Sequence, residues 1–264
     1  MKRIALLLSY DGTDYHGFAN QVNQKTVAGE INSCLSKIFN QEVYVVCAGR
    51  TDAGVHAEFQ VVHFDVDESL LKKFFDKSRL LKSLNKMLDD SIGVLEATEV
   101  SDSFHARFSA KSRTYNYFII QEEFYHPMIL RYAYPVPQKL DLDEMNLACS
   151  YLSGENDFSA FCKSSKLQKS NVRRVNFAAM KKSSLSYDVF EINANAFCHQ
   201  MVRSIVGLLL EIGTGKRPAS ELDRILKGKS RTDLTFIAPP HGLHLVHVEY
   251  QEELFKTDHK VELF

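Results

Sequence analysis

The sequence predicts an α+β protein with two tandem split-βαβ (ferredoxin-like) halves, mainly antiparallel sheets, helices packed on them and a cleft between the halves. Apolar or β-branched runs alternate with longer segments of helical periodicity. The order β-α-β-β-α-β occurs twice along the 264 residues. A polar, turn-like segment, Ser101-Asp102-Ser103, separates the two copies. We therefore expect an N-terminal half at 1–103 and a C-terminal half at 104–264.

The first copy takes its strands from apolar runs at 4–10, 42–48, 59–66 and 92–100. After Thr26, apolar residues such as Ile31 and Leu35 recur at helical spacing, and threonine is a good helix cap. This pattern predicts a helix from residue 27 to about residue 39. A second helical stripe, flanked by many lysines, runs over 69–88.

The second copy repeats the order. Runs at 114–121, 172–182, 185–195 and 243–250 predict strands, the middle two as a hairpin. Asp141 or Asp143 is placed to cap a helix that continues to Leu152. An apolar helix is expected over 197–212, and Ser220 opens a shorter one.

Composition excludes several classes of protein. The net charge is -1 and the pI is about 6.8, so a nucleic-acid role must depend on a local basic patch. No apolar run approaches the roughly 18 residues that a membrane span needs, so we expect no membrane segment. The five cysteines are odd in number and form no CxxC pair. This usage predicts reduced thiols in a cytoplasmic protein.

Cofactor and metal motifs are not indicated. His244 and His247 are three apart in a predicted strand, so they point to opposite faces and cannot chelate a metal with His241. The Gly213–Lys216 stretch lacks the upstream glycine and the hydroxyl residue of a phosphate-binding loop. The sequence therefore predicts neither a cofactor nor a metal.

The densest chemical signal is the loop Ala48-Gly49-Arg50-Thr51-Asp52-Ala53-Gly54-Val55-His56-Ala57. Glycines bracket it, and glycine lets the backbone turn where a side chain would clash. In an extended segment Arg50 and Asp52 face the same way, which would present a carboxylate and a guanidinium to one ligand. The alternative is an ordinary connection in which Asp52 satisfies turn amides.

Two stretches carry local positive charge. The segment Phe104–Tyr117 interleaves aromatic residues with cations, among them Arg107 and Arg113, and contains no acid. Such interleaving suits RNA, because rings stack on bases and arginines neutralise phosphates; the alternative is a strand with a solvated face. The 163–182 stretch contains seven cations, Lys166 among them, without an acidic residue. It also suits phosphate binding, although charge runs are usually solvated faces.

Arg203 lies in the otherwise apolar segment Ala194–Gly207. A buried arginine without a partner is strongly unfavourable, so we expect a carboxylate beside it, which the other half of the chain could supply. The alternative is an arginine whose head group reaches solvent from the helix surface.

Several motifs together resemble the TruA family of tRNA pseudouridine synthases. They lie in the family's order from residue 10 to about residue 250, over nearly the whole chain. The matching segments are Tyr10–Gly17, Ala48–Ala57, Phe104–Tyr117, Asp157–Phe161, Ala194–Gly207 and Ala238–Leu243.

The resemblance implies the pseudouridine synthase fold and an isomerase that converts uridine to pseudouridine at positions 38, 39 and 40 of the tRNA anticodon stem-loop. It also implies a homodimer without a cofactor or metal. Asp52 matches the catalytic aspartate, Arg50 its neighbouring arginine, Tyr115 the active-site tyrosine and Arg203 an arginine near the aspartate. Leu243 and Leu245 match the strand that lines the base pocket. The alternative function is a non-catalytic tRNA-binding module or chaperone, which would not need Asp52.

Overall fold

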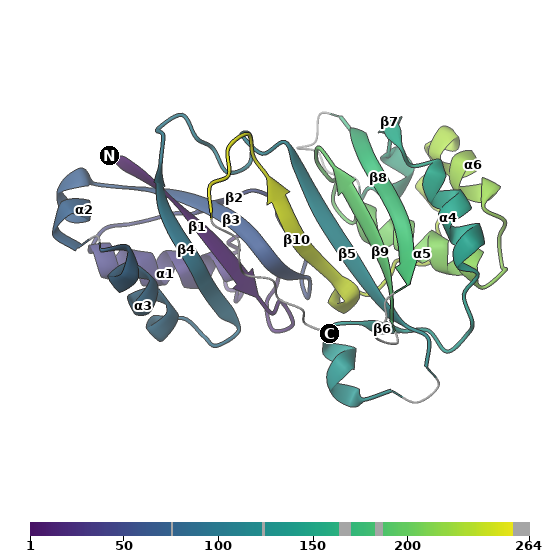
Figure 1. Ribbon diagram of the computed structural model, residues 1–264, viewed down its shortest axis with the longest axis horizontal. Coiled ribbons are helices and arrows are strands. Elements are labelled where there is room, and N and C mark those ends of the chain that lie inside the picture. The colour runs from purple at the N-terminus through teal and green to yellow at the C-terminus, as the bar shows by residue number, and fades with distance from the viewer. Residues whose placement is uncertain (75, 123–124, 164–169, 183–186, 256–264) are drawn as a thin grey trace. The chain divides into compact units, whose positions relative to one another are not determined.

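The protein, here a computed structural model, is a mixed α+β structure with mainly antiparallel strand pairs, as predicted (Figure 1). The structure describes residues 1–264 except 75, 123–124, 164–169, 183–186 and 256–264. Within these described residues, no helix has the length and apolar character needed to cross a membrane.

The chain forms two compact units. Unit 1 comprises residues 1–111 and 245–264, and unit 2 comprises residues 112–244. The division falls within β10 (Leu243–Glu249), whose first two residues close unit 2 and whose remainder belongs to unit 1. The expected halves were 1–103 and 104–264. They differ from these units at 104–111 and at 245–264, both of which belong to unit 1.

The sheet of unit 1 has the strand order of a split β-α-β unit. β1 (Lys2–Tyr10) is central and pairs antiparallel with β4 (Ile92–Val100) and with β3 (His56–Val66). β2 (Val46–Cys47) pairs antiparallel with β3 at Val62 and His63. The pairings β4-β1-β3, with β2 also on β3, are those of the split β-α-β arrangement predicted for this half.

In the described part of unit 1 the helices are α1 (Val27–Phe39), α2 (Glu68–Phe74) and α3 (Lys77–Met87). Thr26 caps α1 as predicted, because its hydroxyl accepts a hydrogen bond from the Gly29 N–H at 3.2 Å. The single helix expected over 69–88 is wrong. Asp76 has extended backbone angles and caps a new helix by accepting from the Ser78 N–H. This cap divides the stripe in two.

The long strand expected over 42–48 is also wrong, since only Val46–Cys47 is a strand. The side chains of α1 provide the reason. The Val43 N–H donates to the Ser36 hydroxyl at 3.0 Å, and the Val45 N–H donates to the Asn32 side-chain oxygen at 2.9 Å. These backbone donors are satisfied by side chains, so they do not need a strand partner.

The sheet of unit 2 contains the predicted hairpin, β8 (Val172–Lys182) and β9 (Tyr187–Ala194). β9 also pairs antiparallel with β5 (Ser112–Ile120), which places Tyr115 opposite Ile192. Two short strands were not predicted. β7 (Gly154–Asp157) extends the sheet beyond β8, and β6 (Tyr134–Pro135) pairs parallel with the end of β5.

The helices of unit 2 are α4 (Leu142–Ser150), α5 (Met201–Gly213) and α6 (Ser220–Gly228). Asp141 caps α4, one of the two predicted alternatives. α5 begins later than expected, because Gln200 adopts a left-handed conformation (φ 63°) that a helix interior excludes. Short 3₁₀ helices lie at Pro127–Arg131, Ser159–Phe161, Arg231–Asp233 and Pro240–Gly242.

Each unit buries its own apolar core. In unit 1 the fully buried side chains include Ile4, Leu6, Ile31, Leu35 and Phe64. In unit 2 they include Tyr117, Phe158, Phe161 and Phe190. All five cysteines lie in the described part of the chain, are buried and form no disulfide.

Gly207, in the middle of α5, allows a test of how closely this helix packs on the neighbouring backbone. A Cβ there would lie 2.2 Å from the carbonyl oxygen of Phe236, so backbone must move to accommodate it. We expect Gly207→Ala to lower the free energy of unfolding by about 1–3 kcal/mol, measured by urea denaturation. Gly228→Ala, at the end of α6, is the matched control because nothing lies within 4 Å of its Cβ position. The control should leave stability unchanged or raise it by up to about 1 kcal/mol. Equal stability of the two variants would contradict the assignment of a close backbone contact.

Candidate active site

Asp52 lies in the loop that connects β2 to β3, half-buried at the start of a tight turn. The carbonyl oxygen of Asp52 accepts a hydrogen bond from the Val55 N–H at 3.2 Å. Gly54 supplies the positive φ of 76° that this turn requires. The carboxylate-bearing residue is therefore held by a closed turn.

A buried hydrogen-bond network fixes the residues before Asp52. The Tyr10 hydroxyl lies 2.8 Å from the Thr51 hydroxyl. The side-chain amide of Gln60, fully buried on β3, donates to the Gly49 carbonyl oxygen at 2.7 Å. Burial raises the pKa of Tyr10 well above its ordinary value, so its phenol stays neutral and available for hydrogen bonding. Hydrogen bonds are stronger in a buried, low-dielectric environment, so this network fixes the backbone that precedes Asp52.

The segment that follows β1 packs its backbone directly on the Asp52 loop. A Cβ on Gly12 would lie 2.0 Å from the Val55 carbonyl oxygen, and a Cβ on Gly17 would lie 2.9 Å from the Thr51 carbonyl oxygen. The Phe18 N–H donates to that same Thr51 oxygen at 3.1 Å. Neither glycine can carry a side chain without displacing the loop. The family resemblance had singled out Tyr10–Gly17, but its role as the support of Asp52 was not predicted.

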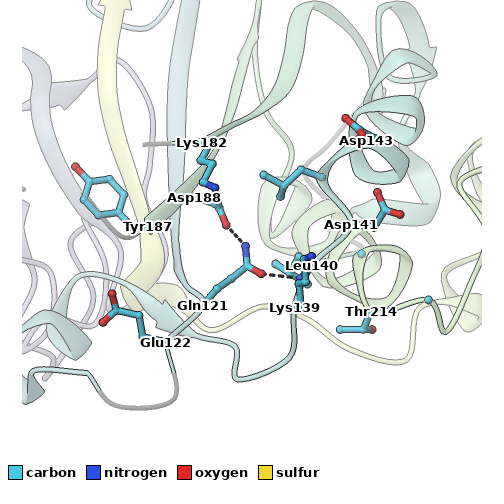
Figure 2. Close-up of a pocket in the computed structure, with 13 residues that line it drawn as sticks. Gln121, Glu122, Lys139, Leu140, Asp141, Asp143, Lys182, Tyr187, Asp188 and Thr214 are labelled. Carbon is cyan, nitrogen blue, oxygen red and sulfur yellow. Dashed lines mark hydrogen bonds between the residues drawn. The ribbon is translucent and has the colours of Figure 1, made fainter. Parts of the chain in front are cut away.

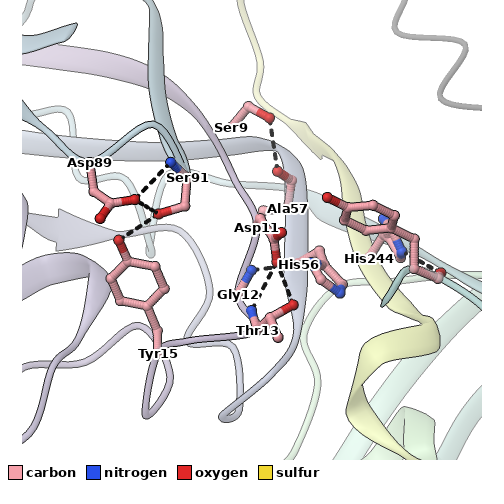
Figure 3. A network of polar contacts seen from close by, with 11 residues as sticks. Ser9, Asp11, Gly12, Thr13, Tyr15, His56, Ala57, Asp89, Ser91 and His244 are labelled. Carbon is pink, nitrogen blue, oxygen red and sulfur yellow. Dashed lines mark hydrogen bonds and ion pairs between the residues drawn. The ribbon is translucent and has the colours of Figure 1, made fainter. Parts of the chain in front are cut away.

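His56 and Asp11 add polar contacts at the other end of the loop (Figure 3). The Nδ1 atom of His56 accepts a hydrogen bond from the Gly12 N–H at 3.1 Å and lies 3.2 Å from Oδ1 of Asp11. The same Asp11 oxygen accepts from the backbone and the hydroxyl of Thr13. These contacts join the start of β3 to the segment after β1, next to Val55.

Tyr15 connects this segment to the start of β4. Its hydroxyl lies 2.8 Å from the Ser91 hydroxyl (Figure 3). Its carbonyl oxygen accepts a hydrogen bond from the Gly54 N–H at 3.3 Å. Asp89 holds Ser91 through two hydrogen bonds, which lower the pKa of the Asp89 carboxyl to about 2. The turn that contains Asp52 is therefore supported by the segment after β1, by β3 and by the residues just before β4.

Tyr115 lies in unit 2, on the buried part of β5. The residue is 6% exposed, and its ring packs edge-on against Phe197, with the ring centroids 5.0 Å apart. Residues two apart on a strand share a face, so Tyr115 is on the face that carries Tyr117. The Tyr117 hydroxyl donates to the Pro239 carbonyl oxygen at 3.0 Å.

Arg203 projects from α5 and is half-buried. Its Nε donates to the Ala238 carbonyl oxygen at 2.7 Å, and the Ala238 N–H donates back to the Arg203 carbonyl oxygen at 3.1 Å. This backbone carbonyl is one partner of the Arg203 guanidinium, and the expected carboxylate beside it stays a prediction. The positive charge of Arg203 is close enough to oppose the rise in the pKa of Tyr117 that burial causes, and it helps burial to lower the pKa of His241. Arg203 and Tyr117 thus bond to adjacent carbonyls, of Ala238 and Pro239, in the segment that also contains His241.

The remaining predicted site residues differ in exposure. Arg50 and Arg107 are exposed, whereas Leu243 and Leu245 are buried. Arg113 is only 6% exposed and donates to the Asn195 carbonyl oxygen at 2.7 Å, which favours a structural role over a phosphate contact.

The basic stretch at 163–182 is less uniform than its sequence suggests. Lys166 lies outside the described residues. Lys181 forms an ion pair with Glu191 on β9, and the Arg173 guanidinium donates to nearby backbone carbonyls. Some of these cations are therefore engaged within the protein. Lys163, Arg174 and Lys182 are exposed.

The histidine pattern gives no metal site among the described residues. His244 is buried and lies 2.9 Å from the Tyr132 carbonyl oxygen through Nε2, whereas His247 is exposed. This difference in exposure is what strand alternation predicts for residues three apart.

The pocket shown in Figure 2, of about 1060 Å³, lies elsewhere in unit 2 and is open to solvent. Its walls come from the ends of β5 and β8, the start of β9, the start of α4 and the turn after α5. The Gln121 amide donates to Asp188 there and accepts from the Leu140 N–H at 2.6 Å. None of the predicted catalytic side chains lines this pocket.

Comparison with known proteins decides the family. The family model described as tRNA pseudouridine synthase matches residues 7–109 and 148–251. The chain belongs to the tRNA pseudouridine synthases. It is 39% identical to tRNA pseudouridine synthase A of Thermoanaerobacter sp. (strain X514) over 250 residues, covering 95% of this chain and 100% of that protein. It is 41% identical to tRNA pseudouridine synthase A of Shouchella clausii (strain KSM-K16) over 259 residues, covering 98% and 97%.

In a solved Cbf5-Nop10-Gar1 complex, one chain matches this protein at 11% identity and a TM-score of 0.34. The match covers 79% of this chain and 45% of that chain, and it is too weak to support the assignment. The sequence relatives alone support the assignment. The synthase is therefore an isomerase that forms pseudouridine in tRNA, and the non-catalytic binding module is set aside.

The basic, aromatic segment of the synthase is anchored through His63. Nδ1 of His63 accepts a hydrogen bond from the Ala106 N–H at 3.1 Å, so this nitrogen must be unprotonated. Burial lowers the pKa of His63 to about 4, and the positive charge of Arg3 acts in the same direction against Asp65.

Because the pKa of His63 is lower in the folded state than its ordinary 6.5, the unfolded chain binds this proton first as the pH falls. We expect stability to fall progressively between pH 6.5 and about 4, measured by urea denaturation. His63→Asn keeps an acceptor but does not titrate, so its loss of stability between pH 6.5 and 4.5 should be smaller. A loss in the variant as large as in the wild type would contradict the role of His63.

Proposed function

We propose that the synthase converts uridine to pseudouridine at positions 38, 39 and 40 of the tRNA anticodon stem-loop, with Asp52 as the nucleophile. The observation that carries the proposal is the support of the Asp52 loop. Gly12 and Gly17 approach its backbone, and the Tyr10–Thr51 contact fixes its start. A nucleophile must be held in a reproducible position to attack one ring or sugar atom, and this loop provides that constraint.

The reaction needs no external reactant. The N1–C1′ bond breaks, the base turns, a C5–C1′ bond forms, C5 loses its proton and N1 gains one. The ionised carboxylate of Asp52 can add to C6 of the base or to C1′ of the ribose, and it leaves again in either case. In this proposal Arg50 and Arg203 orient the carboxylate, a role that the resemblance to the TruA family supports.

A paired uridine must leave its helix before the carboxylate can reach it, at a cost of a few kcal/mol. In this proposal Tyr115 returns part of that energy by stacking on the extruded base. Its hydroxyl also accepts or relays the C5 proton. The edge-on contact with Phe197 supports the proposal, because it restricts how the Tyr115 ring can turn.

The proposed partner is tRNA bound by a homodimer, a state that the resemblance to the TruA family supports. Exposed cations such as Lys163 and Arg174 would contact phosphates without reading sequence. The proposed location is the cytoplasm, which the five cysteines without a disulfide support.

Asp52→Asn tests the nucleophile, since it keeps the shape of the side chain and removes its charge. We expect tritium release from C5-labelled, unmodified tRNA to fall at least about 1000-fold, with tRNA affinity kept within about twofold. Transcripts with a single uridine at position 38, 39 or 40 define the sites. Asp90→Asn, an exposed carboxylate in the same unit, is the matched control and should release tritium at the wild-type rate. Equal release by Asp52→Asn and wild type would remove Asp52 from the centre of the reaction.

Tyr115→Phe tests the hydroxyl alone, because the ring can still pack on Phe197 and stack on a base. We expect the single-turnover rate to fall by about 100-fold or more, with little change in tRNA affinity. Tyr187→Phe, in the adjacent strand β9, serves as the control. If Tyr115→Phe keeps the wild-type rate, the proton-transfer role is wrong and only the stacking role stands.

A further inference from the structure

Phe108 is the most exposed aromatic side chain in the described part of the chain, with 76% of its surface accessible. It lies in the turn between β4 and β5, in unit 1. A single exposed apolar residue is common on protein surfaces and by itself indicates nothing. The surroundings of Phe108 are what distinguish it.

The turn around Phe108 is closed by its own hydrogen bonds. The Ser109 N–H donates to the His105 carbonyl oxygen at 2.8 Å, and the His105 N–H donates to the Ser109 hydroxyl at 2.9 Å. Nδ1 of His105 accepts from the backbone N–H groups of Arg107 and Phe108, at 3.2 and 3.3 Å. These contacts fix the backbone that carries the exposed ring.

The same turn is anchored to the body of unit 1. Ala106 is fully buried, and its carbonyl oxygen accepts from the Tyr250 hydroxyl at 2.7 Å. Arg3 donates to the Phe104 carbonyl oxygen at 2.6 Å. Phe108 is thus an exposed ring on a rigid support, which lowers the entropy lost when a ligand binds to it.

The ring of Phe108 has an aromatic and a cationic neighbour. The His105 ring lies 4.3 Å from it, centroid to centroid, with only 33° between the two planes. The Arg107 guanidinium carbon lies 5.7 Å from the Phe108 centroid. No acidic residue occurs between Ser103 and Gln121, and Lys111 is exposed nearby.

We propose that Phe108, backed by His105 and flanked by Arg107, is a stacking platform for an unpaired base of the RNA substrate. The proposal rests on tRNA being that substrate. Stacking rings pair with the flat faces of bases, and the adjacent guanidinium suits the phosphate that accompanies a base. A protein partner would be expected to cover a larger apolar area than one ring.

The sequence offers a direct probe, because the chain contains no tryptophan. Phe108→Trp places a single indole on the platform, and Tyr44→Trp places one at another exposed aromatic position of the same unit. We expect unmodified tRNA to quench the indole fluorescence of Phe108→Trp strongly and that of Tyr44→Trp weakly. A fully paired RNA duplex should quench neither, because its bases are already stacked. Equal quenching of the two variants by tRNA would overturn the proposal.

Affinity measurements separate stacking from other contacts. Phe108→Ala and Phe108→Leu should each weaken tRNA binding about tenfold, because neither side chain has a π-face, whereas Phe108→Trp should stay within about twofold of wild type. Tyr44→Ala is the control and should bind normally. If Phe108→Leu binds tRNA with wild-type affinity, the contact is simply apolar and the stacking proposal is wrong.

Salt dependence separates the ring from the charge beside it. Phe108→Ala should leave the slope of log affinity against log salt concentration unchanged, whereas Arg107→Ala should lower that slope by about one.

Failure of this inference is distinguishable from failure of the proposed function. Tritium release by the wild type is measured in the same preparations. If the wild type releases tritium and Phe108→Ala binds tRNA normally, the platform is wrong and the proposed function stands. If the wild type binds tRNA and its binding depends on Phe108, but no tritium is released, the proposed function fails and the platform stands. A Phe108→Ala variant that changes its sedimentation mass while binding tRNA normally would reassign the surface to contact between copies.

Discussion

The close approach of two backbone segments in unit 1 is the constraint on which the candidate site depends. At Gly12 and Gly17 the chain after β1 lies directly on the Asp52 loop, at distances that leave no room for a Cβ. Hydrogen bonds from Phe18 and to Tyr15 then join the two segments through main-chain atoms. Main-chain contacts are stiffer than contacts between long side chains, so the carboxylate can remain half-buried while its neighbours are held in place.

Unit 2 uses the same means to hold Arg203. Gly207 lets α5 approach the backbone of Phe236, and the reciprocal hydrogen bonds between Arg203 and Ala238 join the helix to the segment before β10. Tyr117 adds a hydrogen bond to the next carbonyl in that segment. In each unit, a side chain to which the proposed reaction assigns a role (Asp52 or Arg203) is thus positioned by nearby glycines and backbone carbonyls. Packing and function share the same few residues, so substitutions at these positions affect both.

Local signals were predicted from the sequence, and long-range contacts were not. The caps at Thr26 and Asp141 and the β8–β9 hairpin depend on neighbouring residues, which the sequence displays directly. The length of strand β2 was overestimated because Ser36 and Asn32, on a different element, satisfy the backbone N–H groups just before it. The carbonyl beside Arg203 and the burial of Arg113 depend on segments 35 and 82 residues away, respectively. The motifs located the candidate site, whereas its supports became visible only in three dimensions.

The burial of all five cysteines has a practical consequence for work on this enzyme. Thiol reagents need an accessible thiolate, and burial also raises the pKa of Cys34 and, to about 12, that of Cys149. The native thiols of the folded chain should therefore react slowly with maleimides. A new cysteine introduced at an exposed position can carry a spectroscopic label without first removing the natural five. Because the native thiols react slowly, a label on the introduced cysteine can report RNA binding without interference from them.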